Sequence, residues 1–235
     1  MWIPWKVWTT RLSCDRVYPE PGVSVHPLSR LPAPWRRIVD WALTIAAAIL
    51  FVLAFEAEVA KPYRIPTSSM EPYLHCARPA QGCEASTSDR VLVNRLAYRL
   101  GSPQRDQVVV FEAPVTASAC KTGDGGTTFV KRLIGLPGET VREDGRGFIW
   151  IRRPGSARWT KLSEPYLSRT ARLADSSDFR RTWPVPRGEY FMVGDNRADS
   201  CDSRTWGAVP KSNLIGPVIF TYWPPDRLSY HQDGW

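Results

Sequence analysis

A lysine between large apolar neighbours is the residue of this sequence whose chemistry is easiest to predict. Lys131 lies in the run FVKRLIGL, which is typical of a strand, and the alternation of a strand places its side chain on the same face as Phe129 and Leu133. Burial disfavours the ammonium form, so it can lower the pKa of a lysine and make the amine usable as a base near neutral pH. A serine hydroxyl within reach would then have a proton acceptor, as in a Ser/Lys catalytic pair.

Two polar segments carry serines that could meet this amine. Residues 65–74 read IPTSSMEPYL and include Ser69, and residues 193–204 read VGDNRADSCDSR and include Ser200. Taken alone, each segment is also typical of an ordinary polar turn, and a lysine in a strand is also typical of a sheet edge where the amine reaches water. The catalytic interpretation therefore needs all three segments together.

Two other catalytic arrangements compete with this interpretation. For a Ser-His-Asp triad, His26 precedes the apolar segment described below, while His75 and His231 are not well placed, although a spatial meeting stays open. The S-x-x-K and K-T-G patterns of penicillin-binding proteins occur at 118–121 and 121–123, but they share one lysine and no S-D-N triplet accompanies them. We interpret that second match as accidental.

An uncharged apolar run predicts one membrane-spanning helix. Trp41 to Phe55 reads WALTIAAAILFVLAF, and even with residues 38–40 it rises only about 22–27 Å, below the roughly 30 Å hydrocarbon core. The flanking charges must therefore snorkel or the bilayer must thin, and a buried core helix is the alternative. Residues 1–37 carry six Lys and Arg against two Asp and Glu, so the positive-inside rule places the N-terminus in the cytoplasm.

The apolar run is interpreted as an uncleaved signal anchor. Cleavage after Ala57 or Ala60 would put Phe55 or Glu58 at the third position upstream, where a small residue is required. The predicted organisation is a disordered cytoplasmic tail at 1–37, a transmembrane anchor at 38–57 and an extracytoplasmic domain at 58–235. The net charge of +8 is also compatible with a nucleic-acid partner or a solvated basic face, but this topology disfavours nucleic acid.

Short apolar runs broken by Gly, Pro, Asp and Asn follow the anchor, and they predict strands more than helices. The turn at 144–147 has the chemistry of a hairpin. We therefore expect a mainly β domain with an antiparallel sheet. Residues 142–189 are expected to form a peripheral β sub-domain or long loops.

The five cysteines are Cys14, Cys76, Cys83, Cys120 and Cys201. The predicted topology keeps Cys14 reduced and puts the other four in an oxidising compartment, where three pairings are open. We favour a Cys76–Cys83 bridge because the short loop between them contains a proline and a glycine. Zinc is the weaker interpretation because the chain has no C-x-x-C pair, and we expect no metal site and no cofactor.

Taken in this order, the three polar and apolar segments resemble the characteristic boxes of bacterial type I signal peptidases, the leader peptidase family of Ser/Lys serine proteases. The motifs are S-x-M-x-P-x-L around Ser69, KRLIGLPG around Lys131 and GDNR-x-x-S-x-D-S-R from Gly194 to Arg204, and the run at 108–111 falls where that family has another box. The likeness extends from the anchor to about residue 225. It implies a membrane-bound endopeptidase that removes signal peptides from exported preproteins.

The resemblance also implies a role for each matching residue. Ser69 is the implied nucleophile and Lys131 the implied general base, while Ser68 serves only as spacing. Thr67 matches a hydroxyl that stabilises the oxyanion together with the backbone N–H of the nucleophile. Ser200 matches a serine that orients the lysine amine. The residues that match a supporting network of hydrogen bonds and salt bridges are Asp195, Asp202 and Arg204.

The implied family fold is a mainly antiparallel β domain that binds the preprotein as an added strand and cuts after Ala-X-Ala-like sites, with the substrate and the lipid bilayer as its partners. The residues that match its substrate pockets are Ile65, Met70, Leu74, Phe129 and Val130. Two departures concern local packing: Tyr73 stands where threonine is common, and 106–107 reads Asp-Gln where Gly-Asp is common. The non-enzyme alternative is a membrane-tethered β module that binds peptides or envelope proteins.

Overall fold

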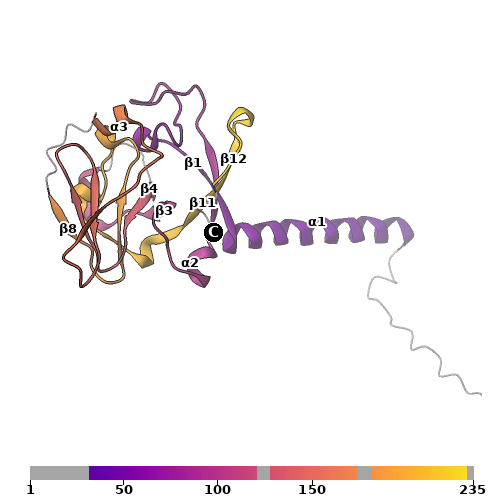
Figure 1. Ribbon diagram of the computed structural model, residues 1–235. Helices are drawn as coiled ribbons and strands as arrows, with labels where there is room; N and C mark the ends of the chain where they lie inside the picture. The colour runs from indigo at the N-terminus through magenta and orange to yellow at the C-terminus, as the bar shows by residue number, and fades with distance from the viewer. Residues whose placement is uncertain (1–31, 121–127, 174–180, 232–235) are drawn as a thin grey trace, which may run out of the picture. The chain divides into compact units, whose positions relative to one another are not determined.

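The computed structural model describes residues 32–120, 128–173 and 181–231. The expectations about Cys14, His26, most of the predicted tail and the S-x-x-K overlap at Lys121 concern positions outside the described residues. The elements keep the labels of Figure 1.

One long helix, α1 (Ala33–Glu58), contains the predicted anchor and begins five residues before it. Its stretch Arg37–Phe55 is long and apolar enough to cross a membrane, and none of that stretch is buried. Trp41 and Phe51 are among its exposed side chains. By length and composition this helix therefore meets the requirements of a membrane span.

A large antiparallel sheet of eight strands confirms the predicted fold class. Its strands follow the order β1-β2-β11-β3-β4-β9-β10, and β12 pairs with β11. Figure 1 labels β1, β3, β4, β11 and β12 of this sheet. The bounds are β1 Ala60–Arg64, β2 Arg90–Asn94, β3 Val108–Glu112, β4 Thr128–Gly135, β9 Glu189–Val193, β10 Val209–Pro210, β11 Leu214–Trp223 and β12 Ser229–Tyr230.

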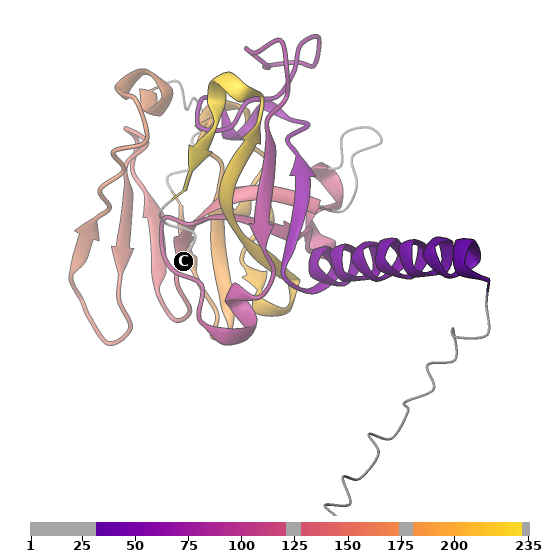
Figure 2. The same cartoon turned by 90° about the vertical axis from the view of Figure 1, so that its right-hand side faces the viewer.

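A second antiparallel sheet of four strands occupies part of the region for which the sequence left a sub-domain or loops open. Its order is β7-β6-β5-β8, with β5 at Thr140–Glu143, β6 at Ile149–Arg152, β7 at Trp159–Lys161 and β8 at Thr182–Pro184. Figure 2 shows it beside the larger sheet. Val141 and Ile151 pack in one buried cluster with Ile134, Phe191 and Val193, so the two sheets share a core.

Short helices and single turns connect the strands. The helices are α2 Ala97–Leu100, α3 Arg169–Leu173 and α4 Ser203–Trp206. The 3₁₀ turns are η2 Ser68–Met70, η3 Val115–Cys120, η4 Arg197–Asp199, η5 Lys211–Asn213 and η6 Pro225–Arg227.

Strand β4 separates two buried clusters because its side chains alternate between its faces. Phe129 and Leu133 lie in the cluster that contains Val109 and Trp206, whereas Val130 packs against the cluster of Ile65, Met70, Leu74 and their neighbours. Lys131 pairs with Val109 of the neighbouring strand β3. Its side chain shares one face of β4 with Phe129 and Leu133, as the alternation predicts. The fold therefore carries a lysine amine into apolar surroundings.

Candidate active site

The turn η2, which follows β1 in the chain, carries Ser69. Thr67 precedes it in extended conformation, and Ser68, Ser69 and Met70 are all buried. Met70 and Leu74 anchor the segment in the apolar cluster, and the Leu74 amide donates to the Met70 carbonyl at 2.9 Å. Apolar side chains on the C-terminal side of the turn thus fix where the Ser69 hydroxyl lies.

Lys131 and Ser69 meet across 62 positions of sequence, since the amine Nζ donates a hydrogen bond to the Ser69 hydroxyl. Lys131 is only 3% exposed. Burial lowers the pKa of its amine to about 8, and the Arg204 guanidinium adds to this effect. The carboxylates of Asp202, Asp195 and Asp199 act in the opposite direction. The balance leaves an amine that is in part neutral at physiological pH.

Thr67 is a second neighbour of the Ser69 hydroxyl. Its Oγ1 is 3.4 Å from Ser69 Oγ, and the Thr67 side chain is exposed rather than packed into the core. An exposed hydroxyl beside Ser69 is accessible to a molecule that binds there. This geometry is compatible with the oxyanion role that the resemblance implies.

The segment after β9 supplies a buried ionic network behind the lysine. Asp202 accepts hydrogen bonds from Ser200 Oγ at 2.7 Å, from the Gly194 amide at 3.0 Å and from Arg204 Nε at 2.9 Å. Burial alone would raise the pKa of Asp202, but these donors, and Arg204 above all, hold that pKa below its usual value. Within the described residues the Ser200 hydroxyl donates to Asp202 and makes no hydrogen bond to Lys131.

Asp195 belongs to a different ion pair, with Arg132. The two side chains make two hydrogen bonds, and the Arg132 guanidinium lies 3.8 Å from the Tyr166 ring centre and 4.5 Å from that of Tyr73. Sequence reasoning missed Arg132 and Tyr166. The Arg in the KRLIGLPG motif was the available signal, because an arginine inside an apolar strand needs a buried partner.

The segment after β9 also contacts the turn η2 directly. The Asn196 amide donates to the Ser69 carbonyl at 3.1 Å, and Asn196 Nδ2 donates to the Ser68 carbonyl at 3.1 Å. Gly194 allows this approach, since a Cβ there would lie 2.6 Å from the Ser69 carbonyl oxygen. Sequence reasoning read Asn196 as part of a motif and gave it no role.

The predicted pocket residues divide between two places. Ile65, Met70 and Leu74 are buried in the same apolar cluster, with Val130 partly exposed against it. Phe129 lies on the other face of β4, where its ring stacks on Trp206 at 5.4 Å between ring centres. Trp206 is a further aromatic neighbour that the sequence did not single out.

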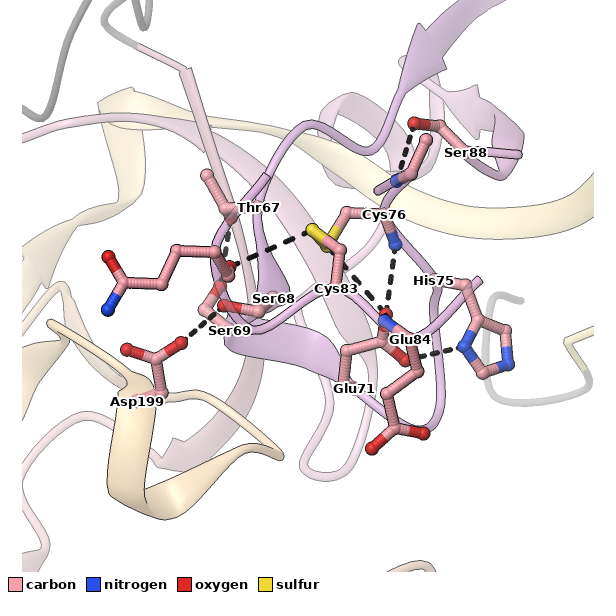
Figure 3. The surroundings of a disulfide bond; sticks show 12 residues. Thr67, Ser68, Ser69, Glu71, His75, Cys76, Cys83, Glu84, Ser88 and Asp199 are labelled. Carbon is pink, nitrogen blue, oxygen red and sulfur yellow. Dashed lines mark hydrogen bonds and ion pairs between the residues drawn. A yellow bond between two sulfur atoms is a disulfide. The ribbon is translucent and has the colours of Figure 1, made fainter. Parts of the chain in front are cut away.

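Two disulfides close loops around the site. Cys76 is bonded to Cys83, the bridge that the sequence favours, and Cys120 is bonded to Cys201, the residue after Ser200 (Figure 3 shows the first). Among the described residues no group of three or more His, Cys, Asp and Glu is arranged to hold a metal ion.

Both described histidines are engaged away from the serine. His75 Nδ1 is 2.5 Å from Glu71 Oε2, and His231 is hydrogen-bonded to Tyr73 and Thr221. Among the described residues, the basic side chain in hydrogen-bond contact with the Ser69 hydroxyl is that of Lys131.

Comparison with known proteins points to one family. The family profile described as "Signal peptidase, peptidase S26" matches residues 38–223. The chain is similar to a probable signal peptidase I-1 of Synechocystis sp. (33% identical, covering 85% of this chain and 89% of the relative). It is also similar to signal peptidase I of Mycobacterium tuberculosis (31% identical, covering 83% and 76%) and of Pseudomonas aeruginosa (27%, covering 90% and 80%). A solved signal peptidase I from Enterococcus faecalis is 31% identical over 49% of this chain and 96% of that one, with a TM-score of 0.36.

Proposed function

The chain belongs to the peptidase S26 family of signal peptidases, and we propose that it removes signal peptides with Ser69 as nucleophile and Lys131 as general base. The observation that carries this assignment is the buried Lys131 amine in hydrogen-bond contact with the Ser69 hydroxyl. No histidine is needed, because burial makes the amine itself a base.

The reaction follows from this geometry. The neutral Lys131 amine accepts the Ser69 proton while Ser69 Oγ attacks the carbonyl carbon of the scissile peptide bond. The Thr67 hydroxyl and the Ser69 backbone N–H donate to the oxyanion of the tetrahedral intermediate. The Lys131 ammonium then protonates the departing amine, which leaves the signal peptide as an acyl-enzyme. A water molecule, deprotonated by the same amine, hydrolyses that ester and restores Ser69.

The network behind the amine keeps it in place. Asp202 is fully buried and held by Arg204 and Ser200, so its charge is fixed near the amine. A fixed charge that needs no rearrangement during the reaction is the kind of electrostatic support that favours catalysis. In this scheme Ser200, Asp195, Asp202 and Arg204 support the pair through their neighbours rather than through the substrate.

The substrate is a preprotein bound in extended form beside β4, where backbone hydrogen bonds give affinity without requiring a particular side chain. Ile65, Met70, Leu74, Phe129 and Val130 form the shallow pockets that select small residues in Ala-X-Ala-like sites.

The helix α1 anchors the enzyme in the cytoplasmic membrane, with the tail in the cytoplasm, the catalytic domain outside and no contact with nucleic acid. Cys14 offers a direct test in sealed spheroplasts, since the other four cysteines are in disulfides. A membrane-impermeant maleimide should label Cys14 only after permeabilisation. Labelling of intact spheroplasts would contradict this orientation.

The catalytic assignment is tested with Ser69→Ala and Lys131→Ala in the full chain, in detergent micelles, with a preprotein substrate. Each substitution should abolish processing while the near-UV circular dichroism stays unchanged. A serine-directed acylating probe should label the wild type and not Ser69→Ala. Retained processing in either variant would contradict the assignment, and an unlabelled wild type would favour the non-catalytic β module.

A further inference from the structure

Ser68, to which the sequence gives only a spacing role, has a specific partner. Its hydroxyl donates a hydrogen bond to the Asp199 carboxylate, 131 positions later in the chain. Figure 3 shows the carboxylate of Asp199 pointing at Ser68, next to Ser69. Ser68 is only 5% exposed, so the serine end of this charge-assisted hydrogen bond is shielded from water.

Three hydrogen bonds connect the turn η2 with the segment formed by Asn196 and the turn η4, and the Ser68–Asp199 bond is one of them. The other two come from Asn196, whose amide binds the Ser69 carbonyl and whose side-chain amide binds the Ser68 carbonyl, both at 3.1 Å. Both Asn196 links hold backbone atoms. Of these three links, the one from Asp199 is the one that holds a side chain of the turn η2, and it does so with a charged group.

A third segment covers this contact. Gly82 lies in the loop closed by the Cys76–Cys83 disulfide, and a Cβ at Gly82 would come within 2.7 Å of both Ser68 Oγ and Asp199 Oδ2. Its φ of +74° is also in the left-handed region that glycine tolerates. The loop backbone therefore packs directly on the hydrogen bond, and Ser68 has little room to choose another rotamer.

We propose that Asp199 is a positioning residue of the signal peptidase reaction, which acts through Ser68 to hold the Ser69 hydroxyl against the Lys131 amine. This inference rests on the proposed roles of Ser69 and Lys131. The Ser68 and Ser69 side chains are on adjacent residues of one 3₁₀ turn, so restraint of one limits rotation of the turn that carries the other. Small displacements of a nucleophile reduce rates strongly.

The carboxylate of Asp199 has a second effect, which a purely structural contact would not have. Four charged groups act on the Lys131 amine: Asp202, Asp195 and Asp199 raise its pKa, and Arg204 lowers it further below the value set by burial. Removing the charge of Asp199 therefore favours the neutral amine. The acid limb of the kcat/KM profile should then move to lower pH.

Three variants of the full-length enzyme separate the two effects. Ser68→Ala removes the hydrogen bond and keeps the charge, so we expect kcat to fall by about tenfold to a hundredfold, with KM and the pH profile unchanged. Asp199→Asn keeps an acceptor for Ser68 and loses the charge, so kcat should stay within about threefold while the acid limb moves to lower pH. Asp199→Ala should show both changes.

A double variant and a control complete the test. Ser68→Ala with Asp199→Ala should lose no more kcat than Asp199→Ala alone, because both remove the same bond. Asp226→Asn, which changes an exposed carboxylate on η6, should behave as the wild type in kcat and pH profile. Full kcat in Ser68→Ala, additive losses in the double variant, or an unshifted profile in Asp199→Asn would each overturn the inference.

A wrong positioning role of Asp199 can be distinguished from a wrong catalytic assignment of Ser69. Ser69→Ala is measured in the same experiment. If Ser69→Ala is inactive and the Asp199 and Ser68 variants are fully active, only the positioning role is wrong. If Ser69→Ala is active, the proposed nucleophile is wrong, and the positioning role of Asp199 falls with it.

Discussion

Arg132 and Asp195 form a bidentate ion pair, and both residues are buried. Arg132 Nε lies 2.9 Å from Asp195 Oδ1, Arg132 Nη2 lies 2.6 Å from Asp195 Oδ2, and each residue is only 1% exposed. Arg132 follows the proposed base Lys131, and Asp195 follows Gly194, against which the Ser69 carbonyl packs. The pair therefore joins the strand of the base to the segment that supports the nucleophile.

Removing one partner of this pair should strongly destabilise the enzyme. Asp195→Ala leaves a buried guanidinium without its counter-ion, and we expect a loss of about 3–5 kcal/mol in the free energy of unfolding. Urea unfolding in detergent micelles measures it. The matched control is Asp226→Ala, whose carboxylate is exposed and 3.9 Å from Arg227, with an expected change within about 0.5 kcal/mol. Equal effects of the two variants would contradict the role of burial.

Cleavage should depend on the protonation of Lys131. The reactive form is the neutral amine, and burial lowers its pKa to about 8, so kcat/KM should rise with pH and level off above that value. Measurement of kcat/KM from pH 6 to pH 10 with a signal-peptide substrate checks this. Lys131→Arg should be inactive throughout, since guanidinium stays protonated. A wild-type profile that falls across this range would contradict the proposed base.

The same lowered pKa predicts that Lys131 destabilises the fold. The unfolded chain, with a lysine pKa of 10.5, binds the proton more tightly than the folded one, so the penalty is complete below about pH 8 and disappears as the pH rises to 10.5. Lys131→Met should therefore raise the free energy of unfolding by about 1–3 kcal/mol at pH 7, and less at pH 10, while abolishing activity. Urea unfolding at both pH values checks the sign; a less stable variant at pH 7 would contradict it.

The sequence predicts the strand face of Lys131 and the fold class better than the contacts around them. Alternation along β4 is a local rule, so it assigned Lys131 to the face of Phe129 and Leu133 without knowledge of the fold. The antiparallel sheet followed from the short apolar runs for the same reason. The apolar run also predicted a helix around 38–57, and α1 contains this segment and extends beyond it at both ends, since arginine at its N-terminal end is a good helix former.

Contacts between residues that are far apart in the sequence could not be predicted from it. Ser68 reads as spacing in its own motif, and only folding brings Asp199 to it. Glu164, from a stretch with no motif, holds Arg197 and Arg172 in a buried cluster next to the GDNR turn. The Cys120–Cys201 bridge was one of several open pairings. In each case the partner is chosen by strand order and register, which local patterns do not encode.

Thr67 offers a test of the oxyanion role that is independent of the base. Thr67→Val keeps the shape and removes the hydroxyl, so kcat should fall by about a hundredfold to a thousandfold with little change in KM. Thr67→Ser keeps the hydroxyl and should stay within about threefold of the wild type. Steady-state kinetics with one preprotein substrate compares the two. Similar activity of both variants would show that the Thr67 hydroxyl does not contact the oxyanion.

The two disulfides should differ in their contribution to stability, because they close loops of very different length. Cys120 and Cys201 are 81 positions apart, whereas Cys76 and Cys83 are seven apart. If a disulfide acts mainly by restricting the unfolded chain, the long loop contributes about 4.5 kcal/mol and the short one about 2.5 kcal/mol. Urea unfolding of the paired variants Cys120→Ser/Cys201→Ser and Cys76→Ser/Cys83→Ser measures both. A larger loss from the short loop would mean that its bridge acts through the folded state, where Gly82 packs on Ser68 and Asp199.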